Sequence, residues 1–457
     1  MLMRFYHFDC NHFDATVGTP TQLSWVLVND ELDVVSERSI KIHPSLDTIS
    51  SPQALLSHGI GPNQLSDGVS ELEAVIAFLE EGSAIHGLIE TGFNSTRFDQ
   101  HLMRHICFRN FLDPYKWEWV NNHSAWDVKP LIAMAEYELP GCIRVNRSEQ
   151  DASIKDYSLE GLGTANEITF IDASNGAIRN IKIAIELCRR VKEASNSFWE
   201  LCLARRSKRV LKELIEYSIE HTTPVIWFDH ESINEFPYKV ILPAGITDES
   251  ELIALDLSKG GEPLLQGQTI TDLIELGAVV RIKLNTSPLI FSPMEGVNNT
   301  CLENLHNLDS DAVIANLSYL KPLVETYKHP RPATKSVLDS LYSIGTLDRD
   351  DAMMLQEMIL EPLNILANNI EVKWNDIRVR ELLIRFVGRN DKSTELLSPA
   401  HYEEWQRLLR RTRLETEKLL KAVDISDLNP KDLDLIAEWS ESYSSQGQNL
   451  SLFIGES

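Results

Sequence analysis

Short apolar runs bounded by turn residues open the chain and then give way to a helical spacing of apolar positions. Three strands are predicted, with a turn at Asn29–Asp30 before the third: Phe5–Phe13, Thr21–Val28 and Asp33–Ile42. The spacing that follows predicts three amphipathic helices: Glu71–Glu81, Asp127–Tyr137 and Asn180–Lys192. A strand meander followed by such helices predicts an α/β domain with a mixed sheet over residues 1–192.

The rest of the chain divides into a strand-rich part and a helical part. Four short strand-like runs separated by turn residues have the pattern of a small β-barrel: Thr223–Phe228, Lys239–Leu242, Glu251–Leu257 and Ala278–Lys283. With flanking helices, this second domain is predicted over residues 193–345. The third, residues 346–457, is almost wholly helical over Thr346–Ser445. Three domains agree with a length of 457 residues.

Composition narrows the class of protein. With 43% hydrophobic and 24% charged residues the chain resembles a soluble globular protein, and no apolar run is long enough to span a membrane. The six cysteines are scattered without a CxxC pair, which argues against a zinc site or a disulfide framework. This cysteine usage predicts a reducing, cytoplasmic environment.

The net charge of −25 disfavours nucleic-acid binding by the average surface, because phosphate neutralisation drives most non-specific affinity. A basic groove can nevertheless lie within an acidic protein. One basic cluster has the composition of a phosphate-contacting surface and equally of the polar face of a helix: Arg205, Arg206, Lys208 and Arg209. Charge alone therefore leaves nucleic-acid binding open.

The segment Gly92–Asp127 combines an acid, arginines and aromatic rings. Asp99 follows a strand-like apolar run, and the residues around it supply guanidinium groups and flat rings: Arg97, Arg104, Arg109, Trp117 and Trp119. Proteins that hold single-stranded nucleic acid use such groups for phosphates and bases. The same residue types also suit a tryptophan core with solvated arginines.

The order of residues in this segment resembles a known family. FNSTRFDQHLMRHICFRNFLDPYKWEW followed by SAWD is similar to the second acidic motif of bacterial exodeoxyribonuclease I. The resemblance spans about Phe5 to Glu438. It implies an RNase H-like exonuclease domain with a mixed sheet, then a small SH3-like β-barrel domain and an all-helical C-terminal domain. That family, within the DEDD-type 3′–5′ exonucleases, degrades single-stranded DNA from the 3′ end with four carboxylates and two metal ions.

Not all of the family's catalytic positions are kept. The first motif, Asp-x-Glu in the family, reads Asp9-Cys10-Asn11, so a neutral amide replaces a carboxylate. Asp99 keeps the second motif. The local match of the third motif places Ser174 at the family's histidine and Arg179 at its last aspartate. No register shift of one or two residues restores them, because no Asp or Glu occurs from Ala173 to Ile185.

These replacements predict an impaired catalytic site. Asn11 binds a hard cation more weakly than a carboxylate would, Arg179 repels one, and Ser174 cannot act as a base without an activator. We therefore expect no bound cofactor, with Mg²⁺ or Mn²⁺ at Asp9 and Asp99 only if nuclease activity remains. Three roles are open for the Arg179 side chain: it forms a salt bridge to Asp9 and Asp99, it contacts a phosphate, or it is solvated.

Three functions remain open on the sequence. The first is a pseudonuclease that binds single-stranded DNA or 3′ ends, within a DNA-repair or phage-defence assembly. Its predicted DNA contacts are Arg97, Arg104, Arg109, Trp117, Trp119, Arg205, Arg206, Lys208 and Arg209. The second is a protein-interaction scaffold without DNA binding, and the third a weak metal-dependent 3′–5′ exonuclease. The absence of Lys and Arg from Leu284 to Leu320 argues against docking of the acidic tail of single-stranded-DNA-binding protein.

Overall fold

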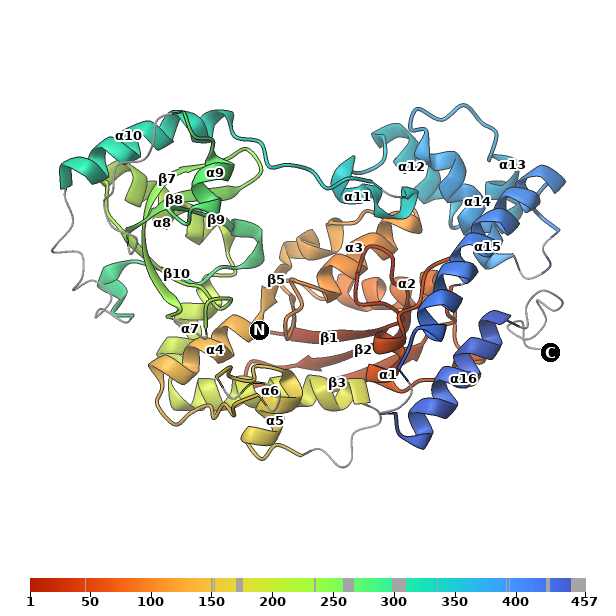
Figure 1. The fold of residues 1–457 in the computed structure, drawn as a ribbon, viewed down its shortest axis with the longest axis horizontal. Helices are drawn as coiled ribbons and strands as arrows, with labels where there is room; N and C mark the ends of the chain where they lie inside the picture. Colours follow the sequence, from red (N-terminus) through yellow and green to blue (C-terminus); the bar gives the residue numbers. More distant parts are fainter. Residues whose placement is uncertain are drawn as a thin grey trace.

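The computed structural model describes the chain except residues 46, 149–150, 152, 170–175, 234–235, 258–266, 298–309, 335, 392, 394, 425–427 and 445–457. Figure 1 shows a central sheet with a second sheet and a group of helices on either side of it, joined by an extended segment from α10 to α11. Within the described residues, no helix is long and apolar enough to cross a membrane.

A five-stranded mixed sheet in the order β3-β2-β1-β4-β5 forms the centre of the first part. Its strands are β1 (Met3–Cys10), β2 (Pro20–Val28), β3 (Val34–Lys41), β4 (Ile89–Gly92) and β5 (Ser124–Asp127). The first three pair antiparallel as the predicted meander, and β4 and β5 run parallel to β1. This is the RNase H-like arrangement that the resemblance implied.

Alternate residues of β1 pack on opposite faces of this sheet. The helices of the first part are α1 (Pro52–His58), α2 (Glu71–Ser83), α3 (Asp99–Arg109), α4 (Val128–Glu138), α5 (Leu159–Ala165) and α6 (Gly176–Ala194). Met3 and Phe5 pack with α4 and α6, whereas Tyr6 and Phe8 pack with α2 and α3. His7 and Asp9 continue the face of Met3 and Phe5 toward the C-terminal end of the strand.

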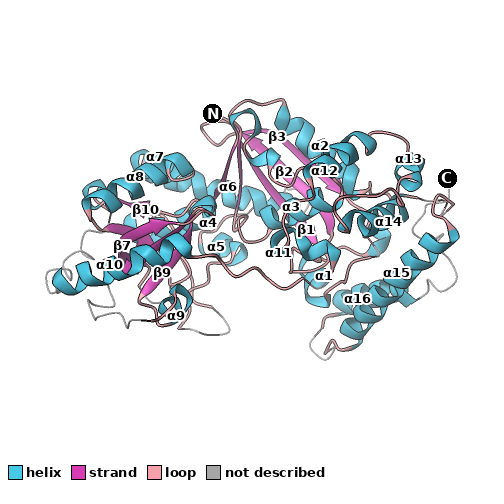
Figure 2. Ribbon diagram, turned by 90° about the horizontal axis from the view of Figure 1, so that it is seen from above, coloured by secondary structure: helices cyan, strands magenta, loops and turns pink. Residues whose placement is uncertain are grey.

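The second sheet is antiparallel, in the order β10-β6-β7-β8-β9. Its strands are β6 (Val225–Phe228), β7 (Tyr238–Ile246), β8 (Glu251–Asp256), β9 (Val279–Lys283) and β10 (Ile290–Phe291). The helices around it are α7 (Asn196–Ala204), α8 (Lys208–His221), α9 (Ile270–Glu275) and α10 (Ser310–Thr326). Figure 2 shows α8 and α10 lying beside this sheet. The four predicted strands are thus present, and the arrangement fits the small barrel.

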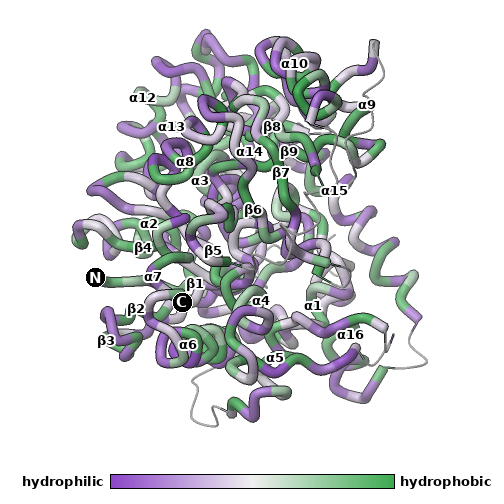
Figure 3. Tube along the Cα trace, turned by 90° about the vertical axis from the view of Figure 1, so that its left-hand side faces the viewer, coloured by the Kyte–Doolittle hydropathy of each residue, from purple (hydrophilic) through white to green (hydrophobic). Residues whose placement is uncertain are grey.

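The C-terminal part is helical and packs on the first part. Its helices are α11 (Ser340–Ser343), α12 (Arg349–Met358), α13 (Leu363–Asn368), α14 (Arg378–Asn390), α15 (Pro399–Lys421) and α16 (Pro430–Ser444). Phe108 and Phe111 join the core of α14, and Trp439 of α16 packs with Leu55 of α1. In Figure 3, α15 alternates hydrophilic and hydrophobic residues, as expected for a helix with one buried face.

Candidate functional site

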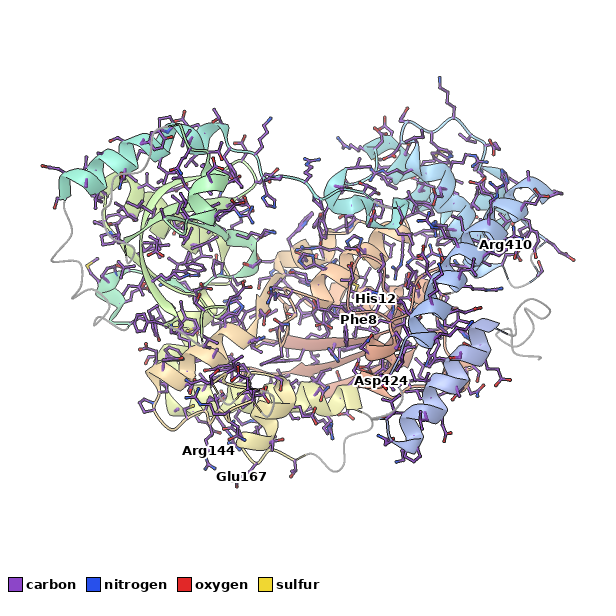
Figure 4. All side chains as sticks on the ribbon, in the orientation of Figure 1. Phe8, His12, Arg144, Glu167, Arg410 and Asp424 are labelled. Atoms are coloured by element: carbon purple, nitrogen blue, oxygen red, sulfur yellow. The ribbon has the colours of Figure 1, made fainter. Side chains whose placement is uncertain are left out.

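A pocket of about 650 Å³ lies at the C-terminal ends of β1 and β4. Its walls come from segments spread along the whole first part and from the segment after β6. Among the lining residues are His7, Asp9, Phe13, His58, Phe93, Asp99, Lys129, Tyr157, Asn180 and His230. This volume is in the range of small-molecule sites. Figure 4 places Phe8 and His12, which flank this end of β1, in the middle of the molecule, whereas Arg410 of α15 lies toward its edge.

Two carboxylates and a histidine meet in this pocket. His7 Nδ1 lies 3.2 Å from Asp99 Oδ1, and its Nε2 lies 3.7 Å from Asp9 Oδ1. The backbone N–H of Phe8 donates a 2.8 Å hydrogen bond to Asp99 Oδ1, which fixes the start of α3 against β1. The imidazole therefore contacts both of the acids that the sequence placed in the site.

The carboxylates determine the charge state of this histidine. Burial alone would lower the pKa of His7, but Asp99 and Asp9 raise it to about 9. Burial raises the pKa of Asp9, an effect that His7 opposes and Asp99 reinforces. At neutral pH His7 is an imidazolium, so the protein supplies its own cation between the two acids.

Asn11 does not face this pocket. The extra residue at the register shift between Asp9 and Cys10 is Thr21 of β2, and Asn11 follows the last residue of β1, where the alternation of the strand no longer fixes the direction of its side chain. Asn11 is fully buried; its Nδ2 donates to Ser50 Oγ at 3.0 Å, and its Oδ1 accepts from the Thr19 N–H at 2.8 Å. The expectation that its carbonyl could help to hold a metal does not fit this position.

The described residues do not fit the metal pair of the DEDD-type site. Only Asp9 and Asp99 supply carboxylates at the matched positions, and His7 contacts both of them. No group of three or more His, Cys, Asp or Glu side chains in the described part of the chain is arranged to hold a metal ion. Ser174 lies outside the described residues. Arg179 is exposed on α6, with no ion pair to Asp9 or Asp99, so the proposed salt bridge is absent there.

Several predicted DNA contacts are instead structural. Arg104 is buried and donates to both carboxylate oxygens of Glu118, at 2.5 and 2.8 Å. Arg109 is buried and bound to both oxygens of Glu71. Arg205 is buried against Glu295 and the Phe291 ring. Because each guanidinium is already neutralised away from solvent, these three do not fit phosphate contacts.

The tryptophans divide in the same way. Trp117 is 5% exposed and packs edge-on against Tyr6 and Phe78, so it belongs to the core. Trp119 is 61% exposed, but it precedes β5 and so lies toward the edge of the sheet opposite the pocket. Neither ring lines the pocket, whereas Phe13, which is 60% exposed, does.

The remaining predicted contacts are accessible to different degrees. Arg97 is exposed and pairs with Glu231 at 3.3 Å, next to the pocket-lining residues His230 and Phe98. Arg206 is half-buried and donates to Ser124 Oγ and the Leu203 carbonyl. Lys208 and Arg209 are exposed at the start of α8. Of the nine predicted contacts, Arg97 is the one whose sequence neighbours line the pocket.

Sequence reasoning missed most of the pocket residues, including His7, Lys129 and His58. His7 precedes Asp9 by two positions on one strand, so the alternation of β1 alone could have identified it. Lys129 and His58 carried no such signal, because they enter the pocket from α4 and from the end of α1.

The three-part fold, with Asp9 and Asp99 together in one pocket, defines the class: a protein with the architecture of a bacterial exonuclease. Similarity supports that class. No protein-family model matches the chain, but exodeoxyribonuclease I of Escherichia coli is 27% identical over 450 residues, 88% of each chain. The enzyme of Haemophilus influenzae is 22% identical over 95% of this chain and 97% of its own.

Solved structures show the same fold. Exonuclease I from Methylocaldum szegediense has a TM-score of 0.80 at 22% identity, covering 97% of this chain and 99% of that one. E. coli exonuclease I in complex with a dA16 oligonucleotide has a TM-score of 0.80 at 19% identity, with the same coverage. The chain is therefore a divergent relative of bacterial exodeoxyribonuclease I.

Proposed function

We propose that this protein binds single-stranded DNA or its 3′ end in the pocket at Asp9 and Asp99 without the hydrolytic power of its relatives. The observation that carries this proposal is the His7 imidazole in contact with both carboxylates. Complexes of the related E. coli enzyme with single-stranded DNA support the choice of ligand.

The reaction of the relatives requires charge that this pocket does not offer. Two metal ions in such a site would activate a water and stabilise the leaving oxygen. Here Asn11 is turned into a buried polar cluster, and an imidazolium already partly neutralises Asp9 and Asp99. Divalent ions must compete with this internal cation for two carboxylates, which weakens their binding.

The same pocket keeps features that can hold a strand. Phe13 is exposed, and Phe93 and Tyr157 add further aromatic surface to the wall. Base stacking on such rings tolerates any sequence, and Arg97 near the pocket provides a guanidinium for the backbone. Aromatic and cationic groups in one cavity favour a single strand over a duplex, whose bases are already stacked.

The decisive experiment measures binding and cleavage together. Fluorescence anisotropy of a labelled single-stranded oligonucleotide, with Mn²⁺ present and at two salt concentrations, gives the affinity and its salt dependence. The oligonucleotide is then sized on a denaturing gel. Salt-sensitive binding to a strand that stays full length supports the proposal, and absence of binding at low salt contradicts it.

A weak metal-dependent nuclease is the second candidate, because Asp9 and Asp99 both remain in the pocket. Shortening of the strand in Mn²⁺ that disappears in Asp9→Ala would favour it. The pocket would then use its remaining carboxylates despite His7.

The burial of Arg104, Arg109 and Arg205 favours the scaffold alternative, because it leaves fewer of the predicted DNA contacts accessible to a strand. We place the protein in a larger DNA-repair or phage-defence assembly as part of the same proposal. Pull-down of the full chain with and without nuclease treatment tests it: a partner retained after treatment supports a protein assembly, and loss of every partner contradicts it.

A further inference from the structure

Lys129 is a half-buried lysine at the first turn of α4, and it lines the pocket. Its Nζ lies 5.8 Å from the centre of the Phe93 ring, another lining residue. No ion pair joins this ammonium to a carboxylate among the described residues. Burial lowers the pKa of this ammonium, and Asp127 and Glu231 oppose that shift without forming an ion pair with it.

The nearest acids are already engaged. Asp127, the N-cap of α4, accepts four donors: the N–H groups of Asn94, Lys129 and Thr96 and the Thr96 hydroxyl, at 2.7–3.1 Å. Glu231 pairs with Arg97 at 3.3 Å. Both carboxylates favour the charge of Lys129, but neither forms an ion pair with its ammonium group.

A second unsatisfied donor lies in the same pocket. The Ile60 N–H donates to His58 Nδ1 at 3.0 Å, and burial lowers the pKa of His58 to about 4. The neutral ring therefore carries its proton on Nε2. That Nε2 is buried and has no hydrogen-bond partner among the described residues. Because solvent does not reach this atom, His58 contributes to the wall of the pocket and offers a donor to a ligand only if the ring turns toward the cavity.

The pocket thus offers two kinds of polar chemistry beside aromatic surface. Lys129 offers a cationic donor for an anion, while Asp9 and Asp99 offer acceptors. A ligand that matches both carries a phosphate on a body with hydrogen-bond donors and a flat ring. A nucleoside monophosphate has these parts, and the volume of about 650 Å³ admits one.

We infer that Lys129 is the counter-charge for the phosphate of a nucleoside monophosphate unit bound in this pocket, so that the protein holds this unit without a metal ion. The unit is either a free mononucleotide or the end of a single strand. The strand form rests on the proposed function, whereas the mononucleotide form does not require it.

The test uses the full chain in EDTA. dAMP, deoxyadenosine and a labelled single-stranded oligonucleotide are titrated against the wild type, Lys129→Gln and Lys129→Arg, with Lys373→Gln, an exposed lysine of the helical part, as the matched control. We expect Lys129→Gln to weaken dAMP binding about tenfold, as for loss of one charge-assisted hydrogen bond. Lys129→Arg retains most of the affinity, and Lys373→Gln retains all of it.

The phosphate-free ligand separates a contact from a folding defect. Deoxyadenosine binding should be unchanged in Lys129→Gln, and an equal loss for both ligands would overturn the inference. Binding that requires a divalent metal would also overturn it. If the oligonucleotide binds the wild type and Lys129→Gln equally, the inference fails while the proposed function stands. If dAMP binds through Lys129 but the oligonucleotide does not bind, the proposed function fails and the inference stands for a free mononucleotide.

Discussion

Two clusters of buried charge in this molecule have opposite designs. The junction cluster, between the first part and the helical part, consists of Asp47, Glu71, Arg109, Arg385 and Arg389. Asp47 has no exposed side-chain surface and lies 3.1 Å from Arg385 and 4.0 Å from Arg389. The pocket cluster consists of His7, Asp9, Asp99 and Lys129 and opens to a cavity.

The difference lies in how completely each charge is compensated. In the junction cluster every carboxylate is paired with arginines, and such pairs resist the loss of either partner. In the pocket cluster the His7 imidazolium contacts both Asp9 and Asp99, and Lys129 forms no ion pair within the described part of the chain. Charge that is compensated internally holds domains together, whereas charge left without a protein partner is free to bind a ligand.

The largest expected effect breaks the junction cluster. Asp47→Ala leaves Arg385 and Arg389 buried without this carboxylate and should cost about 3–5 kcal/mol of unfolding free energy. Thermal and urea unfolding measure it. Asp67→Ala is the control, because that side chain is 77% exposed and 3.8 Å from Lys41, and it should cost less than about 0.5 kcal/mol. Equal stability of the two variants would show that the junction cluster is not a structural centre.

The next effect concerns Asn11. Asn11→Glu forces a longer, charged side chain against Ser50 and Thr19 and should lower the free energy of unfolding by about 2–3 kcal/mol. We expect no gain in Mn²⁺ affinity, even when this change is combined with Ser174→His and Arg179→Asp. Asn180→Glu is the matched comparison, because Asn180 lines the pocket and is half-buried. This variant should bind Mn²⁺ more tightly at little cost in stability. Tighter Mn²⁺ binding by Asn11→Glu would show that the side chain at position 11 turns toward the pocket.

A smaller effect is the pH dependence that His7 contributes. Because Asp99 and Asp9 raise its pKa from 6.5 to about 9, its stabilising contribution is complete below pH 6.5 and is lost as the pH rises through about 9. Roughly 1–2 kcal/mol is expected, since the side chain is 32% exposed. Thermal unfolding between pH 6 and about 9.5 should show this decline in the wild type and a flatter profile in His7→Gln. Parallel profiles would contradict the ion-pair geometry.

The smallest effect compares two exposed arginines in strand binding. Arg97→Gln, near the pocket, should lower the slope of log affinity against log salt by about one, as for loss of one phosphate contact. Arg209→Gln, at the start of α8, should leave the slope unchanged. Anisotropy titrations at several salt concentrations measure both, and the reverse order would move the strand toward α8.

Much of the fold follows from local patterns. The strands of the meander and the helix at Glu71 lie where the sequence predicts them, with ends displaced by a few residues. The segment around Asp99 is different, because its composition suited a strand-binding surface or a tryptophan core with solvated arginines. The structure confirms the core for Trp117 but not the solvated arginines, because Arg104 and Arg109 are buried in ion pairs. Composition cannot specify which acid faces which arginine.

The sequence by itself determined the order of the strand-rich and helical parts and the presence of Asp9 and Asp99, because periodicity and residue identity are local properties. Only the tertiary structure decided that Asn11 is buried against Ser50 and Thr19 and that His7 lies between two acids from separate elements. It also decided that Asp47 pairs with an arginine 338 residues further along the chain. The physical reason is that charge compensation and burial depend on contacts between distant segments, which no local pattern encodes.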